Sequence, residues 1–196
     1  MSASSKVAAT GIKGLDHILL GGFPRNRVYL VQGDPGVGKT TLGLQFLLEG
    51  IRNGETTLYI TLSESKEELD AVAESHGWSL DGIHIYEQLI GEEALSEEES
   101  TVFYPAEIEL SETIKGMLLE VDRVKPQRVV LDSLSEIRLL AQSSLRYRKQ
   151  ILALKQFFAG RNVTVLCLDD RTSEVSDLQL QSVPHGVVEL ERFTPL

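Results

Sequence analysis

One stretch of the chain has a chemistry that limits what the remaining residues can fold into. It reads Gly-Asp-Pro-Gly-Val-Gly-Lys-Thr-Thr over Gly33–Thr41 and fits the pattern Gly-x4-Gly-Lys-Thr. An apolar run at Val28–Val31 leads into it, and leucines at helical spacing follow it as far as Ile51. A strand, a glycine-rich turn and a helix in this order are typical of a loop that wraps around phosphate groups.

Each part of this loop has an expected task. Glycines let the backbone come close to phosphate oxygens at φ values that other residues resist. The backbone N–H groups at positions 36–39 are expected to point at a β-phosphate, helped by the positive end of the helix dipole. Lys39 is expected to reach the β and γ oxygens, and the Thr40 hydroxyl to bind Mg²⁺. The expected phosphate-binding residues are Gly33, Asp34, Pro35, Gly36, Val37, Gly38, Lys39, Thr40 and Thr41.

Length and composition favour one ordinary globular domain. The chain has 196 residues, of which 42% are hydrophobic and 24% are charged. No apolar run is long enough to span a bilayer, and the first residues lack the apolar core of a secretory signal. Cys167 is the only cysteine, so an internal disulfide is excluded. We therefore expect a single domain over residues 1–196 in the reducing cytoplasm, with no membrane partner.

The charge of the chain is concentrated in one segment. The net charge is −10, and Glu87–Glu112 contains nine glutamates and neither lysine nor arginine. Outside this segment acidic and basic residues nearly balance. Such a chain lacks the basic field that drives binding to nucleic acids or anionic membranes, which argues against both partners. We expect residues 87–109 to form an acidic insertion that is a solvated loop.

Strand and helix patterns alternate along the chain. Residues 1–27 form a lead-in with a short amphipathic helix near Leu15–Leu19. The alternation predicts an α/β fold, with a mostly parallel twisted sheet and helices on both faces. The expected strands are 28–31, 57–62, 83–86, 128–133, 163–168 and 187–191. The expected helices are 40–51, one opened by the capping box Ser65–Glu68, one from Ser111 to Val124, and one carrying Tyr147–Phe158.

Polar residues follow several of these strands at their ends. Besides the phosphate loop, they are Ser63-Glu64, Asp132-Ser133 and Asp169-Asp170. In open parallel sheets, ligands bind beyond the carboxyl ends of the strands. The sequence therefore predicts one shared site at this edge.

Hydrolysis of a nucleoside triphosphate needs a metal-holding acid and a group that orients water. Asp132 ends an apolar strand well after the loop, which is the Walker B pattern, and is expected to hold Mg²⁺ with Thr40. Glu64 is the candidate for orienting water, so the expected catalytic residues are Lys39, Glu64 and Asp132. Two questions stay open. Glu64 either orients water or merely flanks the capped helix. Asp169–Arg171 either contacts the γ-phosphate side or the subunit interface, or forms an ordinary ion cluster at the strand end.

With these residues the chain resembles the KaiC-like branch of the RecA superfamily of ATPases. The resemblance covers nearly the whole chain. It rests on Thr10–Asp16, Gly22–Arg25, the phosphate loop, Tyr59–Ser65 and Val130–Ser133. It implies a RecA-like P-loop core, ATP with Mg²⁺, and a homo-oligomer that is often a hexameric ring with nucleotide between subunits. Members act in signalling and timing, and the best-known one is a circadian clock ATPase and autokinase.

The chain departs from the family pattern at two places. The family usually has two adjacent glutamates after the second strand, and the first aligns with the water-activating residue. Here that position is Ser63, which cannot be an equivalent base near neutral pH, and only Glu64 remains. Family domains also continue into a Lys-x-Arg segment that reaches the neighbour's nucleotide. This sequence ends at Leu196, so we expect a minimal or C-terminally truncated member.

Further family positions carry weaker expectations. Arg148 and Lys149 lie where the family places basic interface residues, although a plain solvated helix face is the simpler explanation of them. Ser182 lies in the loop where kinase members are phosphorylated. Three functions follow. The first is a slow Mg²⁺-dependent ATPase that acts in signalling, with or without a protein partner. The second is an ATP-binding assembly module with little hydrolysis, and the third is a recombinase-like DNA-binding ATPase, against which the acidic charge argues.

Overall fold

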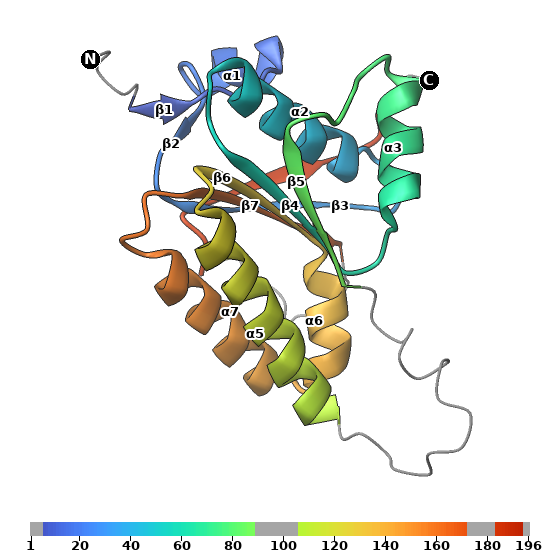
Figure 1. Cartoon of the computed structure of the whole chain (residues 1–196), viewed down its shortest axis with the longest axis vertical. Helices are drawn as coiled ribbons and strands as arrows, with labels where there is room; N and C mark the ends of the chain where they lie inside the picture. Colours follow the sequence, from blue (N-terminus) through green and yellow to red (C-terminus); the bar gives the residue numbers. More distant parts are fainter. Residues whose placement is uncertain (1–5, 89–105, 172–182, 194–196) are drawn as a thin grey trace.

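The fold is built on a six-stranded sheet with the order β5-β4-β6-β7-β3-β8, in which every neighbouring pair is parallel (Figure 1). The computed structural model describes residues 6–88, 106–171 and 183–193. The strands all lie close to the ranges expected from the sequence. They are β3 (Val28–Gly33), β4 (Thr57–Thr61), β5 (Ile83–Glu87), β6 (Arg128–Asp132), β7 (Thr164–Asp170) and β8 (Gly186–Leu190).

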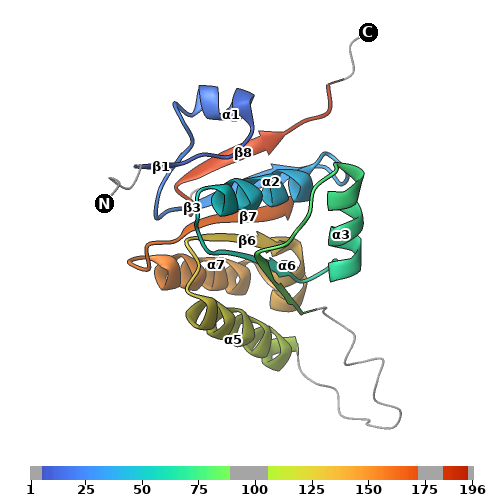
Figure 2. The same ribbon diagram turned by 45° about the horizontal axis from the view of Figure 1, so that its top comes forward.

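Helices cover both faces of this sheet (Figure 2). On one face lie α2 (Lys39–Arg52) and α3 (Lys66–Ser75), and on the other α5 (Ala106–Val124), α6 (Leu134–Ala141) and α7 (Ser144–Phe158). Because both faces are covered, β4 and β6 are buried along their whole length and read as nearly continuous apolar runs. The predicted α/β architecture is confirmed.

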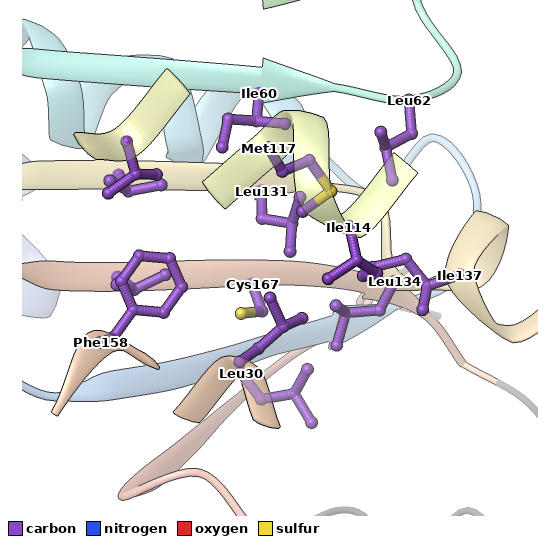
Figure 3. Close-up of a cluster of buried hydrophobic side chains, with 14 of the residues drawn as sticks. Leu30, Ile60, Leu62, Ile114, Met117, Leu131, Leu134, Ile137, Phe158 and Cys167 are labelled. Atoms are coloured by element: carbon purple, nitrogen blue, oxygen red, sulfur yellow. The ribbon is translucent and has the colours of Figure 1, made fainter. Parts of the chain in front are cut away.

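The core between the sheet and α5–α7 is made of aliphatic and aromatic side chains (Figure 3). Met117 from α5 and Phe158 from α7 belong to the same buried cluster as Leu131 of β6 and Cys167 of β7. Burial raises the pKa of the Cys167 thiol to about 12. This cysteine is therefore a small core residue.

The lead-in folds into a small unit of its own. The strands β1 (Val7–Ala8) and β2 (Phe23–Pro24) pair antiparallel, and α1 (Lys13–Ile18) lies between them in the chain. The Asp16 carboxylate accepts hydrogen bonds from the Thr10 backbone N–H at 2.7 Å and from its hydroxyl at 2.8 Å. The expected short helix is thus present, and its Asp16 carboxylate binds the Thr10 residue that precedes the helix.

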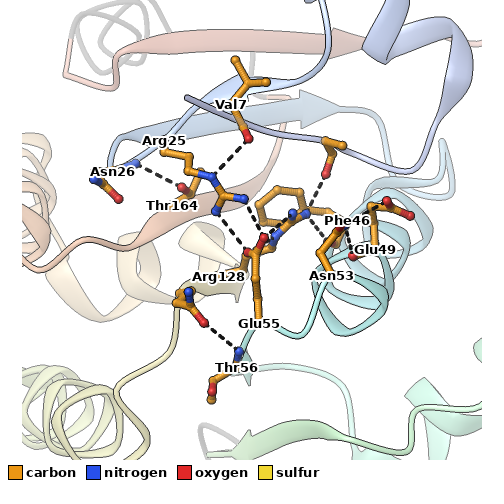
Figure 4. A network of polar contacts seen from close by, with 12 residues as sticks. Val7, Arg25, Asn26, Phe46, Glu49, Asn53, Glu55, Thr56, Arg128 and Thr164 are labelled. Atoms are coloured by element: carbon orange, nitrogen blue, oxygen red, sulfur yellow. Dashed lines mark hydrogen bonds and ion pairs between the residues drawn. The ribbon is translucent and has the colours of Figure 1, made fainter. Parts of the chain in front are cut away.

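An ionic network ties the lead-in to the amino ends of the central strands (Figure 4). The Arg128 side chain is fully buried and donates to both oxygens of Glu55, at 2.7 and 3.1 Å. Arg128 also donates to the backbone oxygens of Ala9 and Phe46. Arg25 donates to the same Glu55 carboxylate, at 2.6 and 3.2 Å.

Two helices differ from expectation. Helix α5 begins at Ala106, inside the range assigned to the acidic insertion, so Ser111 is not its N-cap. The apolar stripe of α5 extends back to Leu110, which is buried, and the residues before it are good helix formers. Helix α6 was not predicted, because its eight residues are too short for a clear period. None of the helices in the described ranges combines the length and apolar character needed to cross a membrane.

Candidate nucleotide-binding site

The glycine-rich loop joins β3 to α2 in the strand–turn–helix arrangement that its sequence predicted. Gly36 and Gly38 have φ values of 74° and 101°, in the region where a side chain is strained. Gly33 is required for a different reason. A Cβ placed there would lie 2.6 Å from Val37 Cγ1 and 2.7 Å from the Leu190 backbone oxygen. The loop can therefore curl against β8 only because these positions are glycines.

Lys39 lies at the first turn of α2, and its side chain is largely buried. Its ammonium group donates to the backbone oxygens of Gly33 at 2.9 Å and Asp34 at 3.1 Å. The same group is 2.9 Å from Asp170 Oδ1, at the end of β7. The lysine thus crosses the concave side of its own loop and reaches the carboxyl edge of the sheet.

Thr40 lies on α2, which follows β3, and Asp132 ends β6. The two residues meet although β7 separates β3 from β6 in the sheet. The Thr40 hydroxyl donates to Asp132 Oδ2 at 3.0 Å. Helix α2 makes this possible by passing close over the sheet. A Cβ on Gly43 would lie 3.0 Å from Val130 and 3.3 Å from Leu168, so a larger residue would push the helix away.

The Thr40 and Asp132 oxygens fit a magnesium site in their chemistry. Both are hard oxygen ligands, and Mg²⁺ is usually held by one or two carboxylates together with substrate phosphates and water. The Asp132 side chain is buried; burial raises its pKa, while hydrogen bonds from Tyr59 and Thr40 and the charge of Lys39 lower it. These residues are the ones that could hold the ion.

Glu64 follows β4 and its carboxylate belongs to this site. Burial raises the pKa of Glu64, the charges of Asp132 and Glu68 raise it further, and the charge of Lys39 lowers it. Its Oε2 atom is buried and has no hydrogen-bond partner among the described residues. The capping box of α3 uses Ser65 and Glu68 instead. The Glu64 side chain therefore takes no part in the cap of α3.

The three residues Asp169, Asp170 and Arg171 have three different surroundings. Asp170 pairs with Lys39 and faces the loop. Asp169 is buried and accepts hydrogen bonds from Ser135 at 2.9 Å and from Arg138 at 2.5 Å, both on α6. Arg171 pairs with Glu189 and Glu191 at the end of β8. Sequence alone treated them as one cluster, whereas only Asp170 contacts the expected phosphate site.

Two residues near the site escaped the sequence analysis. Tyr59 of β4 donates its hydroxyl to Asp132 Oδ2 at 2.5 Å. Arg192, just after β8, places its guanidinium 4.0 Å from the point where a Gly36 Cβ would lie. Tyr59 was expected only as a strand residue, because a phenol in an apolar run carries no signal of its own. The strand order, which decides both contacts, cannot be read from periodicity.

Other predicted positions lie elsewhere. Lys149 is exposed on α7, and Arg148 beside it is partly buried. Ser182 and most of the acidic insertion, residues 89–105, lie outside the described residues. Ser63 is exposed, directly before Glu64. The structure therefore brings together Lys39, Thr40, Asp132 and Glu64 from three separate parts of the chain.

Comparison with known proteins places this site in a family. A family model described as "ATPase: KaiC" matches residues 8–194. The chain is 29% identical to a UPF0273 protein of Thermotoga maritima, in a match that covers 93% of this chain and 77% of that protein. It is 32% identical to a UPF0273 protein of Aeropyrum pernix, over 79% of this chain and 64% of that protein.

The chain is also similar to a circadian clock oscillator protein KaiC of Parathermosynechococcus lividus. That match is 30% identical and covers 91% of this chain but only 33% of the clock protein. The chain therefore corresponds to about one third of that relative's length. The family model, the parallel sheet with its glycine-rich loop, and the motifs in the sequence agree: the chain belongs to the KaiC ATPase family and has its RecA-like P-loop core.

Proposed function

We propose that the protein binds ATP with Mg²⁺ and hydrolyses it slowly, so that turnover or occupancy sets a conformational signal. One observation supports this most directly. The Thr40 hydroxyl donates to Asp132 Oδ2 at 3.0 Å, which joins the glycine-rich loop to the strand-end acid. These two hard oxygen groups would hold Mg²⁺ together with the loop-bound phosphates.

The loop and Lys39 would bind the triphosphate. The Lys39 ammonium donates to two loop carbonyls and pairs with Asp170. Phosphate oxygens would replace these partners. The backbone N–H groups at the start of α2 would also donate hydrogen bonds to the phosphates, and the positive end of the helix dipole would favour this binding. When bound, Mg²⁺ supplies neutralisation of charge on the β and γ oxygens.

Glu64 would orient the attacking water. Its buried Oε2 atom lacks a hydrogen-bond partner among the residues described, and its raised pKa makes it a better proton acceptor than an exposed glutamate. Ser63 takes the position at which the family usually has the water-activating glutamate. We propose that Glu64 acts from one position further along, and that this displacement makes turnover slow.

The first experiment measures phosphate release from purified protein with and without Mg²⁺. Lys39→Ala is expected to reduce release to the background, because a charged donor to the phosphates is lost. Lys115→Ala, at an exposed lysine of α5, is the matched control and should behave as the wild type. Equal release from wild type and Lys39→Ala would overturn the ATPase proposal.

A second candidate is an ATP-binding module that controls assembly and hardly hydrolyses. The serine at position 63 favours it, since a serine cannot activate water as a carboxylate does. Here wild type would bind ATP without turnover, and Ser63→Glu would gain phosphate release. Ser63→Ala is the control that changes the same position without adding a carboxylate. Binding without any gain in Ser63→Glu would count against Ser63 as the cause.

We also propose a homo-oligomer of single-domain subunits in the cytoplasm, with Arg148 and Lys149 reaching a neighbour. Ile18 and Leu20 of the lead-in support association, because their exposed fractions are 77% and 91% and such apolar groups gain from burial.

Light scattering should show a larger mass with Mg-ATP than without it. Leu20→Asp should reduce that mass, whereas Leu119→Asp, exposed by 61% on α5, should not.

A further inference from the structure

We propose that Tyr59 is a positioning residue that fixes the carboxylate of Asp132 for metal binding. The inference rests on the proposed binding of Mg-ATP. The Tyr59 hydroxyl donates to Asp132 Oδ2 at 2.5 Å. The Tyr59 side chain is fully buried and Asp132 is exposed by only 6%. The hydrogen bond is therefore shielded from water, where a charge-assisted contact is strongest.

The register of the sheet brings these two side chains together. On β4 and β6, Tyr59 lies opposite Val130, and Thr61 lies opposite Asp132. Tyr59 and Asp132 are thus diagonal neighbours on one face, within reach of a long aromatic side chain. This is the face that α2 covers and from which Thr40 approaches. A phenylalanine would fill the same space, so packing alone does not require the hydroxyl.

Two donors share one oxygen of Asp132. Thr40, at 3.0 Å, and Tyr59 both donate to Oδ2. A carboxylate oxygen has two lone pairs, so these two hydrogen bonds occupy Oδ2 and leave Oδ1 for the metal or its water. Thr40 has lone pairs of its own that could bind Mg²⁺ while its hydroxyl still donates a hydrogen bond to Asp132. Tyr59 is not itself a metal ligand, and its role is to hold the carboxylate in place.

The expected effect of Tyr59 is therefore on the metal and not on the nucleotide itself. Groups that orient a metal ligand change metal affinity by roughly 10–100-fold when they are removed. Without the phenol, the Asp132 carboxylate loses one of its two side-chain donors among the described residues and can rotate. The Lys39 ammonium contacts the Gly33 and Asp34 backbone oxygens and the Asp170 carboxylate, and none of these contacts involves Tyr59, so metal-free nucleotide binding should be retained.

The test measures binding of a slowly hydrolysed ATP analogue by calorimetry, over a series of Mg²⁺ concentrations and in EDTA. For Tyr59→Phe, the Mg²⁺ concentration at half-maximal enhancement should rise by about 10-fold or more. Affinity in EDTA should equal that of the wild type. Tyr29→Phe is the matched control, because Tyr29 is a buried tyrosine of the same sheet that donates to the Pro24 backbone oxygen at 2.8 Å.

The outcomes separate this inference from the proposed function. If the wild type shows no Mg²⁺-dependent binding, the proposed function fails. If the wild type does and Tyr59→Phe titrates identically, only the role of Tyr59 fails. A Mn²⁺ titration followed by electron paramagnetic resonance gives a second readout of metal binding. A variant that unfolds where Tyr29→Phe folds would show that the hydroxyl serves stability, which also overturns the inference.

Discussion

The two ends of the sheet hold their charges in opposite ways. At the amino end, Glu55 accepts hydrogen bonds from both Arg25 and Arg128 (Figure 4). At the carboxyl end, Lys39 pairs with Asp170 and also lies within the electrostatic range of Glu64 and Asp132. At the amino end, two cations thus surround one carboxylate. At the carboxyl end, three carboxylates surround one lysine.

The carboxyl pKa values follow this contrast. Burial alone would raise the pKa of Glu55, but hydrogen bonds from Arg25 and Arg128 outweigh it and lower the pKa to about 2. Burial raises the pKa of both Glu64 and Asp132, and nearby carboxylates add to the effect. Raised pKa values at a strand-end cluster are characteristic of functional sites. The amino end is built for stability, whereas the carboxyl end keeps negative charge that a metal ion can neutralise.

Breaking the amino-end network should have the largest effect on stability. Arg128→Met leaves the Glu55 carboxylate buried with Arg25 alone and should lower the free energy of unfolding by about 3–5 kcal/mol. Urea denaturation measures this directly. Arg123→Met, at an exposed arginine paired with Glu120, is the control and should change little. If Arg128→Met changed the free energy of unfolding as little as Arg123→Met does, the amino-end network would not be the stabilising end of the sheet.

The same network predicts how stability depends on pH. Because the folded pKa of Glu55 is lowered, its contribution is fully present above the ordinary value of 4.5 and is lost as the pH falls toward about 2. Unfolding free energies of wild type and Glu55→Gln should therefore converge over that range. A gap between the two proteins that stays constant with pH would mean that the Glu55 charge is not what the arginines stabilise.

The parts of the site that were predictable from sequence depend on local chemistry. The glycine-rich loop, Lys39, Thr40 and the capping box Ser65–Glu68 each carry a pattern within a few residues, and all have the predicted local structure. The strands were predictable for the same reason, since burial on both faces produces continuous apolar runs. Asp132 was found because a strand-end acid after such a run is itself a local pattern.

The remaining contacts depend on strand order and helix packing, which local patterns do not record. Tyr59 reaches Asp132 only because β4 and β6 are neighbours with a particular register. The pairing of Arg128 with Glu55 requires the amino ends of two strands and Gly50 of α2 to meet, since a Cβ on Gly50 would lie 2.8 Å from Arg128 Cδ. The different contacts of Asp169 and Asp170 likewise depend on helix packing, because Asp169 pairs with Arg138 of α6 and Asp170 pairs with Lys39 of α2.

Asp170 offers a smaller test of the carboxyl end. Its half-exposed pair with Lys39 competes with phosphate for the lysine. Asp170→Asn should tighten nucleotide binding by roughly twofold to fivefold, the range of a solvent-accessible ion pair. Fluorescence titration with an ATP analogue measures this, and Glu189→Gln, which removes an exposed partner of Arg171, is the control. Weaker binding in Asp170→Asn would instead place this carboxylate among the groups that help to hold the nucleotide.

Glu64 gives the smallest and most specific test of the contrast. Because its folded pKa is raised, its protonated form stabilises the fold at low pH, and this contribution is lost as the pH rises through the folded pKa. At neutral pH, Glu64→Gln should therefore stabilise the nucleotide-free protein, by about 0.5–1 kcal/mol, while reducing phosphate release. Thermal unfolding and phosphate release measure the two effects, with exposed Glu74→Gln as the control. We expect Glu55→Gln to lower the free energy of unfolding and Glu64→Gln to raise it. This result would mean that the unfavourable charge lies at the end of the sheet where the nucleotide and its metal are proposed to bind. A loss of stability in both variants would mean that the two ends of the sheet do not differ in this way.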